Sequence, residues 1–197
     1  MSPAAGRGAP RKGGRVYRTW MTWWARRARG AALGALTLLF VGYNLAMRGA
    51  FTPPRGRAPQ APDLRLTYTP AALDAMLASW QGAETAFIVG HLVVDGLYPL
   101  VYGSWLMLAL ARLYGPRVGA RVRVGWWPLV AVLADWGENV ALSVRMALYP
   151  RPMPLLAWLS AACTLTKWLA VALSVGAVLA GAAWAGWRAW RHGGLKV

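Results

Sequence analysis

Ionisable side chains recur inside the long apolar stretches of this chain. The clearest case is E-T-A-F-I-V-G-H-L-V-V-D-G-L-Y-P-L-V-Y, residues 84–102. At about 100° per residue in a helix, five polar side chains fall on one face: Glu84, His91, Asp95, Tyr98 and Tyr102. Ionisable groups at membrane depth are costly, so they normally face a bundle interior or a water-filled cavity. This face therefore predicts a functional site within a membrane-spanning helix.

Two later apolar stretches repeat the pattern. Asp135, Glu138 and Asn139 stand at i, i+3 and i+4, so they project from one face of a helix. Lys167 shares a face of the last stretch with Thr164. Counted from the expected membrane boundaries, His91 lies a few residues below the outer interface, and the other ionisable groups lie near the midplane: Asp95, Asp135, Glu138 and Lys167. The candidate catalytic residues are His91, Asp95, Asp135, Glu138 and Lys167, and the candidate ligand-binding residues are Tyr98, Tyr102, Asn139 and Thr164.

The charges of this cluster do not balance. Lys167 is its only certain cation, against three carboxyl groups. A dry interior resists the net negative charge, so we expect a carboxyl group that keeps its proton, a bound cation, or water admitted from the outer face. A fourth interpretation is a satisfied buried network, in which Lys167 pairs with Glu138 or Asp135 and tyrosines donate hydrogen bonds.

A metal site is an alternative for the same residues. His91 and Asp95 stand at i, i+4, and Asp135 and Glu138 would complete the set from across the bundle. Imidazole with carboxylates suits a divalent transition metal such as Zn, Mn or Fe. One histidine is few for zinc, and the chain has no H-E-x-x-H pattern. It also lacks the G-x-S-x-G pattern of a serine nucleophile.

The composition is that of a membrane protein. Hydrophobic residues make up 57% of the 197 residues and charged residues 14%, which is outside the usual range of a soluble domain. The net charge of +16 is concentrated in the terminal segments and one loop, so we expect no nucleic-acid partner. A single cysteine, Cys163, excludes an internal disulfide.

We predict an all-α, polytopic fold: a bundle of four transmembrane helices with a short amphipathic helix outside the membrane. The spans are expected at about 31–47, 83–111, 126–148 and 155–187, within a domain of residues 30–190. Residues 1–29 are expected to be a basic, disordered arm, and residues 191–197 a tail. From Trp20, the run W-M-T-W-W-A-R-R-A-R suits the interface of the bilayer and anionic lipid headgroups. Lys and Arg gather in both ends and the 112–123 loop, which predicts that both termini are cytoplasmic. The abundant Ala, Gly, Arg and Trp suggest a GC-rich genome, and we expect the protein in the cell (plasma or inner) membrane.

Local signals add detail. Thr69 followed by Pro70 predicts a helix start, and Gly82 predicts a stop after the short amphipathic helix. Pro99 removes a backbone donor and predicts a kink near Asp95. Arg145 lies near the end of its helix, where we expect it to extend toward the membrane surface.

Four motifs carry a resemblance: L-R-L-T-Y-T-P before the second span, D-G-L-Y-P-L-V-Y-G within it, A-D-W-G-E-N in the third and L-T-K-W in the fourth. The chain resembles a group of small uncharacterised four-helix integral membrane proteins over residues 63–168. The resemblance implies the architecture and the same choice of residues, but no activity.

The expected function is to bind or process a small or lipid-like ligand near the outer leaflet. One version is a metal-assisted lipid hydrolase, in which Asp135 or Glu138 activates water and His91 transfers a proton. A second alternative is a transport or proton-relay component using Asp95, Glu138 and Lys167; four spans are few for it, so it requires a homo-oligomer or a partner. A third is a structural membrane subunit without a catalytic role.

Overall fold

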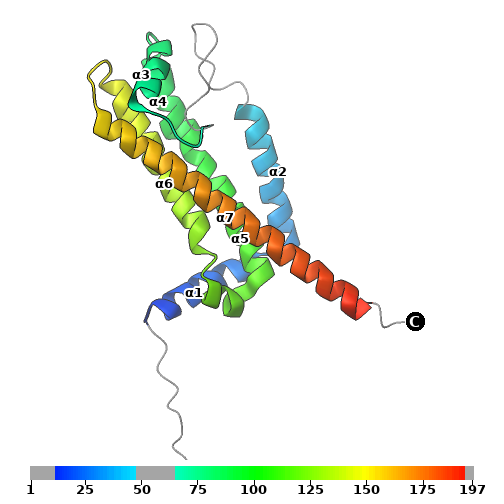
Figure 1. The fold of residues 1–197 in the computed structure, drawn as a ribbon. Helices are drawn as coiled ribbons and strands as arrows, with labels where there is room; N and C mark the ends of the chain where they lie inside the picture. The colour runs from blue at the N-terminus through cyan, green and yellow to red at the C-terminus, as the bar shows by residue number, and fades with distance from the viewer. Residues whose placement is uncertain (1–11, 48–64, 194–197) are drawn as a thin grey trace, which may run out of the picture.

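The computed structural model describes residues 12–47 and 65–193, and every regular element in these two ranges is helical. Figure 1 shows α5, α6 and α7 packed together, with α1 across one end of the bundle and α3 at the other. We call these the α1 end and the α3 end. The helices are α1 (Lys12–Arg27), α2 (Gly30–Met47), α3 (Pro70–Ser79), α4 (Glu84–Val89), α5 (Asp95–Val122), α6 (Trp126–Ala147) and α7 (Pro154–Gly193), with a π-helical turn (Gly90–Val94) between α4 and α5.

Two continuous helical segments are long and apolar enough to cross a membrane, Glu84–Gly115 and Pro154–Arg191. A third span is formed if α1 and α2 are counted together, although they meet at a bend of 89°. The predicted span at 126–148 is present as α6, but α6 is not among these candidates. The acids and amide at positions 135, 138 and 139 explain why, because they lower the hydropathy of the middle of this helix. The coarser prediction, an all-helical protein with membrane-spanning helices, is thus supported.

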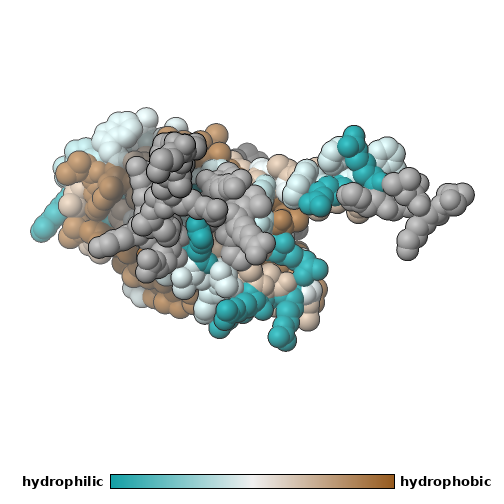
Figure 2. Space-filling model, turned by 90° about the horizontal axis from the view of Figure 1, so that it is seen from below, coloured by the Kyte–Doolittle hydropathy of each residue, from teal (hydrophilic) through white to brown (hydrophobic). Residues whose placement is uncertain are grey.

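Apolar side chains point outward as well as inward. Leu38 on α2 is 76% exposed, and Leu133 and Leu169 on α6 and α7 are more than half exposed. Such surfaces suit a lipid environment, in which apolar exposure carries no cost. Viewed from the α1 end, the surface also carries separate hydrophilic patches, one of them on the projecting end of α7 (Figure 2). Arg188 and Arg191 lie in that part of α7, beside exposed tryptophans.

Of the basic arm expected at residues 1–29, residues 12–27 form α1, which includes the expected interfacial Trp/Arg segment; residues 1–11 lie outside the described part of the chain. Tyr17 and Met21 stand four residues apart and are almost fully buried. The Tyr17 hydroxyl accepts a hydrogen bond of 2.8 Å from the backbone N–H of Gly125. This helix therefore forms because two apolar side chains dock on the bundle, a signal that the surrounding arginines and glycines hide in the sequence. At the other end of the chain, α7 continues to Gly193, three residues into the tail expected at residues 191–197.

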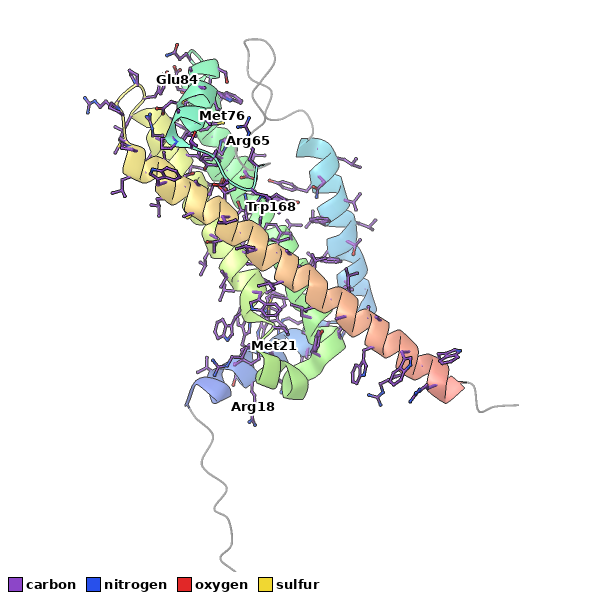
Figure 3. All side chains as sticks on the ribbon, viewed as in Figure 1. Arg18, Met21, Arg65, Met76, Glu84 and Trp168 are labelled. Atoms are coloured by element: carbon purple, nitrogen blue, oxygen red, sulfur yellow. The ribbon has the colours of Figure 1, made fainter. Side chains whose placement is uncertain are left out.

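α3 agrees with its sequence signals. The Thr69 side chain caps the helix by accepting a hydrogen bond of 3.2 Å from the N–H of Ala72, with Pro70 in the first turn. Leu73, Met76 and Leu77 are buried on α3, where they join a core cluster with residues of α4, α6 and α7. Figure 3 shows Glu84 beside this end of the molecule and Arg18 of α1 at the opposite end.

A backbone irregularity ends at Asp95, where Pro99 predicts a kink. Residues 90–94 form a π-helical turn, and the N–H of Asp95 bonds to the carbonyl of Gly90. Further along α5, Gly103 allows α6 to approach closely, because a Cβ atom there would collide with the side chain of Val132. This close contact sets the separation of the two helices beside Tyr102 and Asp135.

Candidate functional site

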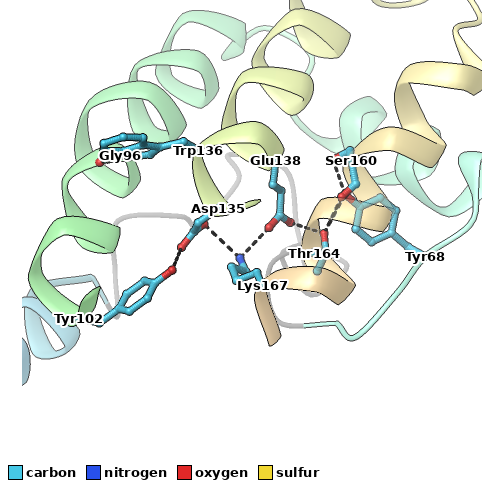
Figure 4. Close-up of polar contacts among 9 residues, drawn as sticks. All are labelled: Tyr68, Gly96, Tyr102, Asp135, Trp136, Glu138, Ser160, Thr164 and Lys167. Carbon is cyan, nitrogen blue, oxygen red and sulfur yellow. Dashed lines mark hydrogen bonds and ion pairs between the residues drawn. The ribbon is translucent and has the colours of Figure 1, made fainter. Parts of the chain in front are cut away.

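A buried ion-paired triad joins α6 to α7. Lys167 Nζ lies 2.6 Å from Glu138 Oε2 and 3.3 Å from Asp135 Oδ1. All three residues are at most 6% exposed. Asp135 and Glu138 share a face of α6 because they stand three residues apart, and Figure 4 shows Lys167 reaching between them. Of the two partners that the satisfied-network interpretation offered to Lys167, the structure supplies both.

Hydrogen bonds extend the triad in both directions. The Tyr102 hydroxyl donates to Asp135 Oδ2 over 3.0 Å, and the Thr164 hydroxyl donates to Glu138 Oε1 over 2.6 Å. Beyond Thr164, Tyr68 Oη lies 3.4 Å from the Thr164 hydroxyl and 2.5 Å from Ser160 Oγ. We call this set the central network; it consists of Tyr68, Tyr102, Asp135, Glu138, Ser160, Thr164 and Lys167. It connects α5, α6, α7 and the segment before α3 through buried polar contacts alone (Figure 4).

The negative charge at the centre of the central network favours the protonated form of the Tyr68 hydroxyl. Two carboxylates face one ammonium group, so the fully ionised triad carries one excess negative charge. Tyr68 lies at its edge, outside the membrane-spanning segments. Burial, reinforced by the negative charge of Glu138, raises the pKa of Tyr68 to about 12. Its hydroxyl therefore remains a hydrogen-bond donor at neutral pH.

The four other residues of the predicted polar face of residues 84–102 lie in different environments. His91 is buried, with Nδ1 2.9 Å from the carbonyl of Phe87 and its ring 4.0 Å from the Phe87 ring. Tyr98 faces α2, where its hydroxyl donates to Asn44 Oδ1 over 3.2 Å. Glu84 is exposed and accepts a hydrogen bond from the N–H of Gly82. Asp95 is buried at the end of the π-helical turn, within electrostatic range of Tyr98 and Tyr102.

The proposed metal ligands do not come together in the described residues. Nowhere in ranges 12–47 and 65–193 do three His, Cys, Asp or Glu side chains form a group that could hold a metal ion. One cause is visible. The ammonium group of Lys167 occupies the position between Asp135 and Glu138 that a cation would need.

Further buried polar residues lie on α6 nearer the α3 end. Arg145 is 1% exposed and pairs through Nη2 with Asp74 Oδ1 on α3. The expectation that Arg145 extends to the membrane surface is wrong, because α3 covers it and supplies the carboxylate. Its Nε and Nη1 groups have no hydrogen-bond partner among the described residues.

Two more side chains of α6 carry buried polar atoms without a hydrogen-bond partner. Both side-chain atoms of Asn139 and the hydroxyl of Ser143 lack a partner in the described part of the chain, although these residues are only 2% and 4% exposed. We refer to Asn139, Ser143 and Arg145 as the outer donors. Asn139 was a ligand-binding candidate; the signal for Ser143 is its i+4 spacing from Asn139. Nothing in the local sequence marks Arg145 and Asp74 as partners, since they are 71 positions apart.

Comparisons of the chain with protein-family models, with curated protein sequences and with solved structures found no match. The interpretation of the site therefore rests on its geometry.

Proposed function

We propose that this chain is a polytopic membrane protein that binds a small or lipid-like ligand at the outer donors, in the half of the bundle nearer α3. In this proposal α2, α5, α6 and α7 are the four membrane spans. α6 crosses the membrane despite its acidic residues because the central network neutralises and covers them. The apolar outer surfaces of α2, α6 and α7 support this arrangement.

The distribution of basic side chains supports an orientation. Arg18, Arg26 and Arg27 lie on α1, and Arg188 and Arg191 lie at the far end of α7. Cytoplasmic segments of membrane proteins carry an excess of Lys and Arg. The α1 end accordingly faces the cytoplasm and the α3 end faces the outer leaflet.

The α1 end also suits anionic lipid headgroups as partners. The guanidinium of Arg27 lies 3.6 Å from the ring centre of Trp23, and that of Arg191 lies 4.2 Å from the ring centre of Trp187. Such pairs combine an aromatic group that prefers the membrane interface with a cation that attracts anionic lipid.

The observation that carries the proposed function is the unpaired state of the outer donors. Native proteins leave few buried polar groups without a partner, because each costs about 1–3 kcal/mol. Here three residues of one helix carry such groups, whereas both carboxylates of the central network lie within 3.3 Å of the Lys167 ammonium group. Hydrogen-bonding atoms of a ligand would satisfy the outer donors.

Mass spectrometry of the purified protein tests this proposal. We expect a stoichiometric small molecule or lipid to co-purify with the wild type, and its amount to fall at least about tenfold in Asn139→Leu, in line with the loss of two hydrogen bonds. Ser174→Ala is the matched control, because Ser174 is equally buried but bonds only within its own helix, to the carbonyl of Ala170. Equal amounts of every bound molecule in all three proteins would refute the proposal.

A proton relay is the second candidate, and the continuity of the central network favours it. Groups that exchange protons follow one another from Tyr102 to Tyr68 without an apolar interruption. This function predicts proton flux in liposomes that Glu138→Gln abolishes. Liposomes that hold a pH gradient equally well with the wild type and with Glu138→Gln would exclude it.

A further inference from the structure

We infer that Arg145 recognises an acidic group of the ligand, a phosphate or a carboxylate, and that the Asp74 carboxylate takes the place of that group in the ligand-free protein. This inference rests on the proposed ligand-binding function and specifies the chemistry of the ligand.

The first argument is the incomplete use of the guanidinium. An arginine side chain offers five N–H donors in a planar fork that matches carboxylate and phosphate oxygens. In this structure Nη2 is paired with Asp74 Oδ1, while Nε and Nη1 have no acceptor within the described residues. An oxyanion with two or more free oxygens would satisfy donors that a single carboxylate oxygen leaves unused.

The second argument is the unequal burial of the pair. The Arg145 side chain is 2% exposed, whereas the Asp74 side chain is 43% exposed. The cation is thus fixed in the protein interior, and its partner approaches from the surface of α3. A buried guanidinium requires a counter-charge, so an incoming anion can exchange with Asp74 without changing the buried charge.

The third argument is that this exchange needs little movement. α3 is held through Leu73, Met76 and Leu77, which are buried. Asp74 lies next to this apolar face and is only partly buried. A change of side-chain rotamer would release the carboxylate while the core cluster of α3 stays packed.

An aromatic ring borders the anion site. The Arg145 guanidinium lies 5.8 Å from the ring centre of Tyr149. A lipid phosphate and a free acid share this chemistry, so the experiment must separate the two sources.

The experiment compares wild type with Asp74→Asn, Arg145→Lys and Arg145→Gln, and uses Arg151→Gln as the control. Arg151 is an exposed arginine a few residues further along the chain. The full-length protein is placed in phosphatidylcholine nanodiscs, and binding of inorganic phosphate is measured by calorimetry. In a second arm, phosphate is omitted, and native mass spectrometry counts the phosphatidylglycerol retained from mixed nanodiscs.

We expect Asp74→Asn to bind one of the two probes about tenfold more tightly than wild type, because the competing carboxylate is gone. Arg145→Gln should bind that probe at least about tenfold more weakly, with Arg145→Lys between them, since charged hydrogen bonds account for factors of this size. Arg151→Gln should equal wild type. Tighter binding of phosphate assigns a free acid, and tighter binding of phosphatidylglycerol assigns a lipid headgroup.

The inference is overturned if Asp74→Asn binds neither probe more tightly than wild type, a result that does not depend on Arg145→Gln folding. It is also overturned if folded Arg145→Gln keeps the wild-type affinity. A co-purifying ligand that Arg145→Gln retains would refute this inference and leave the proposed function intact. A wild type with no co-purifying ligand would refute the proposed function, while the phosphate titration would still report on Arg145.

Discussion

Two buried cations on neighbouring helices, Lys167 and Arg145, have different sets of charged partners. Lys167 in the central network contacts two carboxylates that are themselves buried, and hydroxyl groups of Tyr102 and Thr164 bond to those carboxylates. Arg145 contacts one carboxylate that is nearly half exposed, and two of its nitrogen groups have no partner among the described residues. The comparison separates a cation with two buried carboxylate partners from a cation with one partly exposed partner and unused donors.

The largest expected effect is that of Lys167→Met. This change leaves the carboxylates of Asp135 and Glu138 buried without a counter-charge, and breaking a buried pair in this way costs about 3–5 kcal/mol. Equilibrium unfolding of the purified protein in detergent would measure it. Combining Lys167→Met with Asp135→Asn and Glu138→Gln should recover most of the loss. A triple variant as unstable as the single one would show that charge balance is not what the central network provides.

A pair of hydroxyl deletions tests the comparison at an intermediate scale. Thr164→Val removes a donor to Glu138, so we expect a loss of about 1–3 kcal/mol in unfolding free energy. Ser143→Ala removes a hydroxyl without a partner in the described chain, so stability should stay within about 0.5 kcal/mol of wild type or rise. Both values come from one set of unfolding curves. Equal losses would contradict the distinction between the central network and the outer donors.

The smallest expected effect is confined to alkaline pH. Because burial raises the pKa of Tyr68 from 10.0 to about 12, the unfolded chain releases this proton at lower pH than the folded protein. The stabilising contribution is complete below pH 10 and is lost as the pH approaches 12. The unfolding free energy of wild type should thus fall more steeply across this interval than that of Tyr68→Phe. If the unfolding free energies of wild type and Tyr68→Phe change in parallel with pH, the pKa of Tyr68 is not raised in the folded protein.

Sequence spacing was sufficient for the features that depend on one helix. Thr69 and Pro70 mark the start of α3, and the i, i+3 spacing of Asp135 and Glu138 places both carboxylates on one face of α6. Lys167 could be named as their partner because it is the one basic residue in the interior of the last apolar stretch. These inferences hold since helical periodicity and capping are local properties of the chain.

Contacts between distant segments determined the rest. α1 is helical because Tyr17 and Met21 find a docking surface on the bundle, and Arg145 is buried because Asp74 of α3 lies over it. A π-helical turn occupies residues 90–94, directly before Asp95. A pairing across 71 positions, or an extra residue within a helical turn, depends on packing. Local sequence patterns do not encode which segments meet, so the contrast between the central network and the outer donors emerged only from the folded chain.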